Sequence, residues 1–254
     1  MEEFAKYILN EDDLVSKIEI IYFLAPKLGI NFDKSIVFKT EIARMFLKYT
    51  KLKVDYNFVL TACLLCNCKK VDDSQKMGKL QSYAKEGAEH LAKLGFDKKF
   101  CKTCEGVNRY SVIDSRELES DILELVDIFG GMLIDRSERT GFNPDEAMVL
   151  VEHRNLKGKY NRYVEIFRDF VLAMEKIEIH GAVNTTVFAR LQKLMRESKN
   201  ITIFAKRIAL EYSPLVDKKL DELDGKETST IQQSNRTLFS AESEERILNN
   251  IKQS

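Results

Sequence analysis

The sequence predicts an all-α fold. Long segments carry apolar residues at helical spacing, and polar stretches separate these segments. Only 11 Gly and three Pro occur among the 254 residues, so few positions interrupt the helical patterns. With 44% hydrophobic and 31% charged residues, the composition is that of an ordinary globular protein with a sizeable core. The length suggests one or two domains.

Charge and hydropathy exclude several classes of partner. Lys plus Arg and Asp plus Glu number 40 each, so no global field favours nucleic acid or a membrane surface. No apolar run approaches the roughly 20 residues that span a bilayer. The N-terminal MEEFAKYILNEDD is acidic and amphipathic, unlike a signal peptide. We therefore expect a cytoplasmic protein with no membrane span and no nucleic-acid partner, in which thiols stay reduced.

The first predicted helix covers residues 11–27. Asn10 or Asp12 is a candidate N-cap, and Gly29 is expected to end the helix after Leu28. Further helices are predicted over 34–49, over 55–68, where FVLTACLLC is apolar nearly all round and therefore buried, and over 77–94, closed by Gly95. Asp97 opens a short helix that carries Cys101 and Cys104.

The second half continues this pattern. Helices are predicted over 117–135, from Pro144 through His153, over 160–178, over 185–197 and over 201–212, the last ending near Pro214. Beyond Leu223 the chain becomes the polar GKETSTIQQSNRT, which predicts a flexible linker. Residues 241–251 form a candidate amphipathic helix, either a frayed tail or a segment that docks onto a partner.

Residues Asp127 to Met148, reading DIFGGMLIDRSERTGFNPDEAM, resemble the last helix-and-loop motif of the HD-GYP family, a branch of the HD-domain metal phosphohydrolases. FVLTACLLCNCKK (58–70) resembles the helix that ends Leu-Leu-His-Asp-x-Gly-Lys in that family. YAKEGAEHLAKLGF (83–96) resembles its His-x-x-x-Gly-Ala-Glu helix. The resemblance covers about residues 36–152, close to half the chain, and implies a bacterial-type signalling protein.

The resemblance implies an HD-domain-like helical bundle with extra N- and C-terminal helices. It divides the chain into an N-terminal helical extension (1–33), a degenerate HD-GYP-like domain (34–158), a C-terminal helical region (159–222) and a polar, flexible tail (223–254).

The metal ligands that the family requires are mostly absent from the matching positions. A metal pair needs clustered His and Asp to bind and activate water. Here Cys66 stands at the place of a His, Asn67 at that of the bridging Asp, Tyr83 at that of the next His, and Val107 and Asn108 at those of the paired His. Asp127 remains, with Lys70 at the place of the phosphate-contacting lysine. The resemblance therefore implies no catalytic residue, no bound metal and no cofactor.

Two C-x-x-C pairs, Cys63 with Cys66 and Cys101 with Cys104, match a zinc signature in spacing. Each pair lies inside a helical pattern, where thiols three residues apart face the same core. We interpret them as core thiols. A four-cysteine zinc site stays open as the alternative, because Cys66 falls at a ligand position of the family.

Asp135, Arg136 and Arg139 also allow two interpretations. By the resemblance they join Lys70 and Asp127 in a relict pocket for a phosphate-bearing ligand, since the guanidinium fork suits phosphate. The structural alternative is that they hold the turn after the helix. The latter is preferred because the metal ligands are missing.

Three functions follow from the resemblance. The first is a pseudoenzyme that acts as a scaffold or regulator and binds a protein partner, through the C-terminal helices and tail. The second is a module that senses a nucleotide of the cyclic di-GMP type. The third, which the missing ligands disfavour, is a metal-dependent phosphodiesterase or other phosphohydrolase with an unusual metal set.

Overall fold

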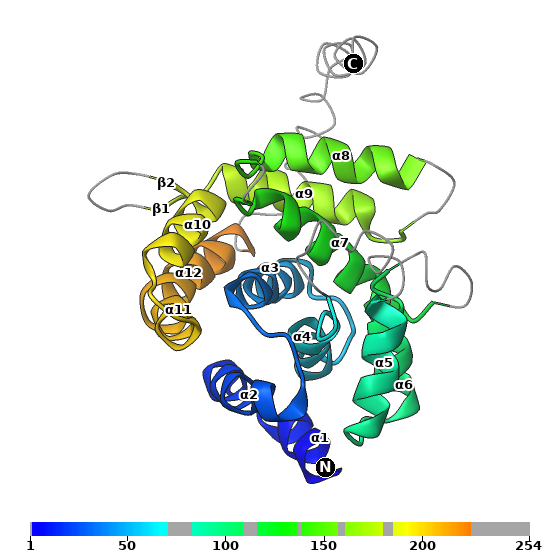
Figure 1. Ribbon diagram of the computed structural model, residues 1–254. Helices are drawn as coiled ribbons and strands as arrows, with labels where there is room; N and C mark the ends of the chain where they lie inside the picture. The colour runs from blue at the N-terminus through cyan, green and yellow to red at the C-terminus, as the bar shows by residue number, and fades with distance from the viewer. Residues whose placement is uncertain are drawn as a thin grey trace. The chain divides into compact units, whose positions relative to one another are not determined.

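The protein is all-α, as the sequence predicts. The computed structural model describes residues 2–70, 83–108, 116–136, 139–156, 161–179 and 185–224 (Figure 1). The helices are α1 (Glu2–Asn10), α2 (Leu14–Leu28), α3 (Lys34–Thr50), α4 (Tyr56–Leu65), α5 (Tyr83–Lys93), α6 (Lys98–Glu105), α7 (Leu118–Leu133), α8 (Pro144–Leu156), α9 (Val164–Glu175), α10 (Val187–Glu197), α11 (Ile201–Arg207), the π-helix η2 (Ile208–Tyr212) and α12 (Ser213–Asp224). A two-residue hairpin pairs β1 (Glu178–Ile179) with β2 (Thr185–Thr186).

Two compact units make up the chain, residues 1–216 and 217–254. Within the first unit lie all helices from α1 to η2, including those that the sequence assigned to separate N- and C-terminal segments. The predicted helix over 241–251 lies outside the described residues, so it stays a prediction. Among the helices in the described part of the chain, none combines the length and apolarity needed to cross a membrane.

Side-chain caps define several helix starts. Asp33, Asp55 and Asp97 each accept a hydrogen bond from a backbone N–H in the first turn that follows, as an N-cap residue does. Gly29 ends α2 in the left-handed region with φ 63°, as predicted. The predicted cap of α2 is wrong: Asp13 caps the helix, while Asn10 ends α1 and Asp12 accepts a hydrogen bond from Asn57.

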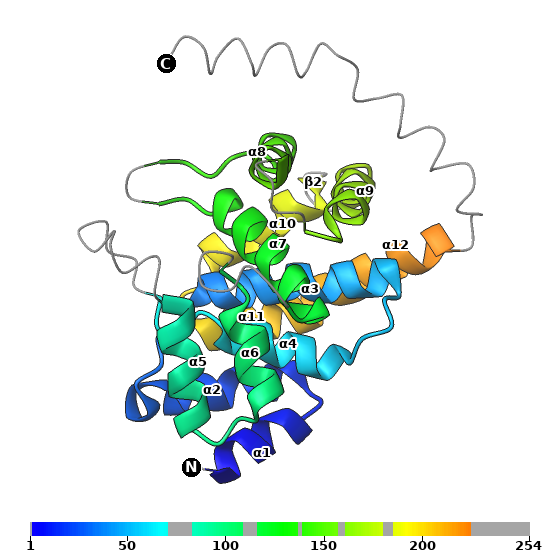
Figure 2. The ribbon, with the colours of Figure 1, turned by 90° about the vertical axis from the view of Figure 1, so that its right-hand side faces the viewer.

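Helix α3 lies at the centre of the first unit and packs against α4, α7, α9, α10 and α11. Its residues 36–43 and 45–47 are buried, so the helix is covered on nearly all sides. Edge-to-face ring contacts join α3 to its neighbours, from Phe46 to Phe167 at 5.1 Å and to Phe170 at 5.4 Å. Around this core, α8 lies beside α9 and next to α7 (Figure 1), and α5 lies beside α6 (Figure 2).

The helical segment after Ile201 does not end near Pro214, contrary to the sequence prediction. It continues through the π-helix into α12, which runs to Asp224. Pro214 is the second residue of α12 and directly follows the π turn, in which the Ser213 N–H donates to the Ile208 carbonyl five residues earlier. The wider π turn also contains Tyr212, which is fully buried and donates a hydrogen bond to the Val187 carbonyl at 3.1 Å.

A buried lysine ties α2 to α4. The Lys17 ammonium is bonded to Asn57 Oδ1 and Thr61 Oγ1, and the residue is 1% exposed. Burial lowers the pKa of Lys17 to about 8, although the nearby carboxylates of Asp12, Glu11 and Asp55 act in the opposite direction. The folded protein therefore binds the proton less tightly than the unfolded chain does.

The Lys17 pKa gives a pH-dependent stability. Because the pKa is lower in the folded state, the lysine destabilises the fold below about pH 8, and this cost disappears as the pH rises toward the unfolded pKa of about 10.4. We predict that the free energy of unfolding of the wild type, relative to Lys17→Met, increases by up to about 1 kcal/mol per pH unit between pH 8 and 10. Urea unfolding at several pH values measures this difference; a decrease with pH would contradict the lowered pKa.

Candidate functional site

Three donors from two other segments of the chain converge on Asp127 of α7. Asp127 Oδ1 accepts hydrogen bonds from Lys39 Nζ of α3 and from Asn67 Nδ2, which follows α4, each at 2.8 Å. Asp127 Oδ2 accepts one from Lys70 Nζ, also at 2.8 Å. The side chains of Lys39 and Asp127 are each 9% exposed, whereas that of Lys70 is 21% exposed. We call Lys39, Asn67, Lys70 and Asp127 the Asp127 cluster.

A glycine on α7 allows Lys39 to reach this position. A Cβ atom on Gly130 would lie 2.8 Å from Lys39 Cγ and 3.3 Å from Ile42 Cδ1, which is too close for the lysine to stay in place. Glycine inside a helix costs about 1 kcal/mol relative to alanine. The close approach of Lys39 explains why the sequence nevertheless has glycine here.

The ion pair is fixed at neutral pH. Burial opposes ionisation of Asp127, but the charges of Lys39 and Lys70 outweigh it, and the pKa of Asp127 lies far below its ordinary value. Burial likewise opposes the charge on Lys39, and Asp127 outweighs it, so the pKa of Lys39 lies above its ordinary value. Asp127 and Lys39 therefore both remain charged over a wide range of pH.

Neutral groups fill the rest of the site. Burial raises the pKa of both the Cys66 thiol and the Tyr83 phenol, so each stays protonated at neutral pH. Lys70 Nζ lies 5.0 Å from the centre of the Tyr83 ring, within the range of a cation–π contact. Asn67 Oδ1 is buried and has no hydrogen-bond partner among the described residues. The site thus carries one carboxylate, two ammonium groups and no imidazole from the described residues.

This charge distribution disfavours a divalent metal ion. A carboxylate offers about four lone-pair positions, and donors already occupy three of those of Asp127. A divalent ion about 4 Å from a single ammonium group is repelled by about 8 kcal/mol at an effective dielectric constant of about 20. Over the described ranges, no group of three or more His, Cys, Asp or Glu side chains is arranged to hold a metal ion.

The cysteines considered for zinc carry free thiols. Cys63, Cys66 and Cys104 are buried, and Cys101 is half-buried. Burial raises the pKa of Cys63 and Cys104 well above the ordinary value and that of Cys101 to about 11. Because zinc binds the thiolate, protonated thiols in an apolar setting fit the role of core residues. The fifth cysteine, Cys68, is buried as well.

Arg139 caps the C-terminal end of α7. Its guanidinium donates hydrogen bonds to the carbonyl groups of Gly131 at 3.0 Å, Met132 at 3.0 Å and Thr140 at 3.1 Å, and it lies over the ring of Phe142. Carbonyls at a helix end lack partners within the helix, so a cation there supplies both hydrogen bonds and charge compensation. The hydrogen bonds of Arg139 therefore hold the turn after α7.

Asp135 and Arg136 differ in their contacts. Asp135 is exposed; it accepts a hydrogen bond from the Gly141 N–H at 2.8 Å and pairs with Arg196 at 3.4 Å. The backbone of Arg136 pairs with that of Arg139, but its guanidinium makes no hydrogen bond or ion pair within the described residues. A Cβ atom on Gly131 would lie 3.8 Å from Arg136 Nη2 and 3.9 Å from Lys39 Nζ, so both cations border the same space.

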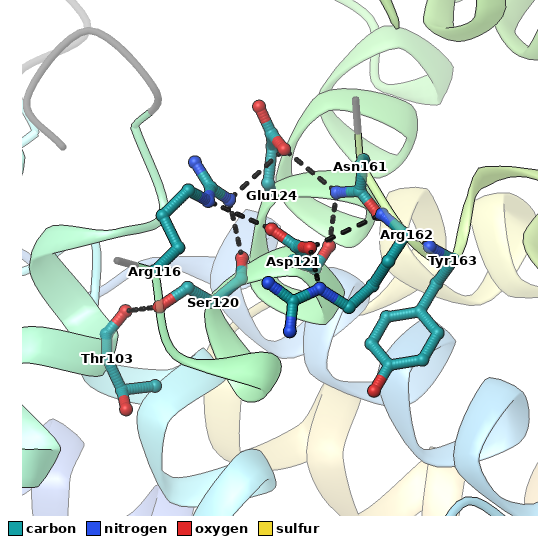
Figure 3. Close-up of polar contacts among 8 residues, drawn as sticks. All are labelled: Thr103, Arg116, Ser120, Asp121, Glu124, Asn161, Arg162 and Tyr163. Carbon is teal, nitrogen blue, oxygen red and sulfur yellow. Dashed lines mark hydrogen bonds and ion pairs between the residues drawn. The ribbon is translucent and has the colours of Figure 1, made fainter. Parts of the chain in front are cut away.

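A second buried cluster lies two turns earlier on α7 (Figure 3). Arg116 pairs with Asp121 at 2.9 Å and with Glu124 at 3.2 Å, and Arg162 pairs with Asp121 at 2.7 Å. Asn161 donates to Glu124 at 2.8 Å. Asp121, Glu124 and Asp127 follow at intervals of three, so three successive turns of α7 each bury a carboxylate beside a cation.

Sequence reasoning missed Lys39 and this second cluster. The usable signal was position: Lys39 follows Ile36 by three residues and precedes Ala43 by four, which places it on an apolar face of α3. A lysine on such a face needs a buried partner. Lys70 and Asp127, by contrast, were both expected near the site from the family resemblance, and the structure joins them directly.

Removing the Asp127 charge should destabilise the protein strongly. Asp127→Asn leaves Lys39 without a counter-charge, and we predict a loss of about 3–5 kcal/mol in the free energy of unfolding, measured with urea. The carboxylate stabilises the fold above its unfolded pKa of about 3.9, and Lys39 does so below its unfolded pKa of about 10.4. The loss should therefore be constant from about pH 5 to 9 and shrink below about pH 4.

The matched control is Asp135→Asn, because Asp135 is exposed and its pair with Arg196 lies at the surface. Its effect should stay within about 1 kcal/mol. Equal losses from the two substitutions would contradict a central role for the Asp127 ion pair.

Comparisons with known proteins do not identify a relative. No family model matches the chain, and searches of curated proteins and of solved structures return no significant match. The family resemblance therefore rests on the residues named above.

Proposed function

We propose that the protein is a non-catalytic regulator or scaffold with a degenerate HD-GYP-like domain. The observation that carries the proposal is the occupation of the Asp127 carboxylate by Lys39, Lys70 and Asn67. In a metal phosphohydrolase the corresponding carboxylate binds a cation that activates water. Here the positive charge comes from two side chains of the protein itself. An ammonium group neutralises the carboxylate, but it has no open coordination position for water.

The neighbouring residues support the same proposal. Cys66, Asn67 and Tyr83 stand where the resemblance places metal ligands, and all three are neutral in the structure. Hydrolysis would need a base and a Lewis acid at these positions. A regulator would bind a protein partner. The exposed side chains of Phe23 (82%) and Leu210 (79%) are candidate contacts for that partner. Partner capture by the wild type can be compared with capture by variants that carry serine at these two positions. The free thiols fit a reducing compartment such as the cytoplasm.

The proposal predicts that the protein binds no stoichiometric metal and does not hydrolyse phosphodiesters. Protein purified without chelator should contain far less than one iron, manganese or zinc ion per chain by elemental analysis. It should not cleave bis(p-nitrophenyl) phosphate or cyclic di-GMP when Mn²⁺ is added, because the carboxylate is paired with lysines.

Two other results would change the assignment. Two metal ions per chain, with turnover that Asp127→Ala abolishes, would establish a phosphohydrolase. One zinc ion per chain, lost in a Cys63→Ser and Cys104→Ser double variant, would establish the four-cysteine site.

A second candidate function is the sensing of a phosphate-bearing ligand. Lys39 and Lys70 pair with the one carboxylate of the Asp127 cluster, and Arg136 borders the same space as Lys39, so these three cations outnumber that carboxylate. Lys70 is partly exposed, and the Arg136 guanidinium has no hydrogen-bond partner among the described residues. Such an arrangement favours an anion with several acceptor oxygens. Arg139 is not assigned to this role, because its donors bind backbone carbonyls.

Thermal denaturation separates the sensor from the scaffold. A sensor should show a rise in melting temperature with cyclic di-GMP or inorganic phosphate, because a ligand that binds only the folded state stabilises it. Arg136→Ala should abolish the rise. The control is Lys93→Ala, which removes an exposed lysine of α5, and this variant should keep it. No rise in the wild type at millimolar ligand would exclude these ligands and leave the scaffold.

A further inference from the structure

A separate pocket lies between α2, α3 and the segment formed by α11 and the π-helix. Its volume is about 200 Å³. Leu14 and Ile18 of α2, Val37 of α3 and Ile208 of the π-helix contribute apolar walls. Ala205 and Ala209 line the pocket from the α11 side, and their short side chains leave the space that larger residues would fill.

A buried carboxylate lies in the wall of this pocket. Glu41 of α3 is 1% exposed. Its Oε1 accepts hydrogen bonds from Ser213 Oγ at 3.0 Å and from Arg44 Nη2 at 2.9 Å, and its Oε2 accepts one from Arg44 Nε at 2.8 Å. Three donors leave about one lone-pair position of the carboxylate for a further donor. All three residues line the pocket.

A second carboxylate lies at an exposed position of the lining. Asp13 caps α2 by accepting a hydrogen bond from the Ser16 N–H at 2.8 Å through Oδ2. The lining therefore carries the carboxylates of Asp13 and Glu41 and the single guanidinium of Arg44. Its charges sum to a negative value, which favours a cationic ligand.

We propose that this pocket binds a small organic cation, a primary amine with a compact apolar body. The ammonium group would interact with Glu41 and Asp13, and the apolar body would lie against Ile18, Ala205 and Ala209. A few placed polar groups in a mostly apolar cavity are typical of a small-molecule site. The π-helix at its edge agrees with such a site, because π turns occur frequently at functional positions.

The volume sets the size of the ligand. An apolar cavity of about 150 Å³ accommodates benzene. A pocket of about 200 Å³ therefore has room for one ring and a short chain. We choose 2-phenylethylamine as the probe, with 2-phenylethanol as its neutral counterpart and 3-phenylpropionate as its anionic counterpart.

Isothermal titration of the full chain with the three probes tests the proposal. The amine should bind at least about tenfold more tightly than the alcohol, because a charge-assisted contact is worth about that factor, and the acid should not bind. Asp13→Asn keeps the helix cap but removes the charge, and it should weaken binding of the amine by about threefold. Ala209→Leu fills the cavity and should abolish binding.

The control is Ala92→Leu, which adds the same side chain to an exposed position of α5 and should leave binding unchanged. Circular dichroism checks that the variants fold. If Ala209→Leu does not fold, Asp13→Asn still tests the proposal. Equal binding of amine and alcohol would overturn the cation specificity, and no binding of any probe would overturn the pocket.

Discussion

The charge of Asp127 constrains the centre of the first unit. A buried carboxylate without a partner would cost several kcal/mol, so α7 can pack in the core only if cations come to it. One cation comes from α3 and one from the turn after α4, and Asn67 adds a third donor. The ion pairs therefore fix the mutual positions of three segments that the hydrophobic effect alone would position less specifically.

The same principle extends along α7. At Asp121 and Glu124 the compensating groups come from Arg116 and Asn161, and Arg162 completes the pairing of Asp121. Each of these buried carboxylates thus accepts at least one hydrogen bond or ion pair from a segment that follows or precedes α7 in the chain. The aromatic cluster around Phe46 and Phe129 supplies apolar burial beside these pairs. In this way α7 is held both by apolar burial, which is not specific, and by ion pairs and hydrogen bonds, which specify the segments that pack against it.

The sequence was informative where local chemistry decides structure. The all-α class, the end of α2 at Gly29 and the start of α6 at Asp97 follow from periodicity and capping. It was less informative where distant residues decide. The position of Lys39 on an apolar face indicates a buried partner, but α7 must be known to pack there before Asp127 is identified as that partner. Pro214 resembles a helix end until the π turn shows that the chain stays helical. The i,i+3 spacing indicates that Arg44 pairs with Glu41, but no sequence pattern places Ser213 on the same carboxylate.

Gly130 is coupled to Lys39, although the two residues lie far apart in the chain. Its missing side chain is the space that the Lys39 stem occupies. Evolution can therefore change neither position independently: a larger residue at 130 requires a shorter one at 39, and loss of the lysine removes the reason for the glycine. Related sequences should accordingly show paired substitutions at 39 and 130. Such paired substitutions would be visible in an alignment of related sequences even where the motifs around Asp127 have diverged.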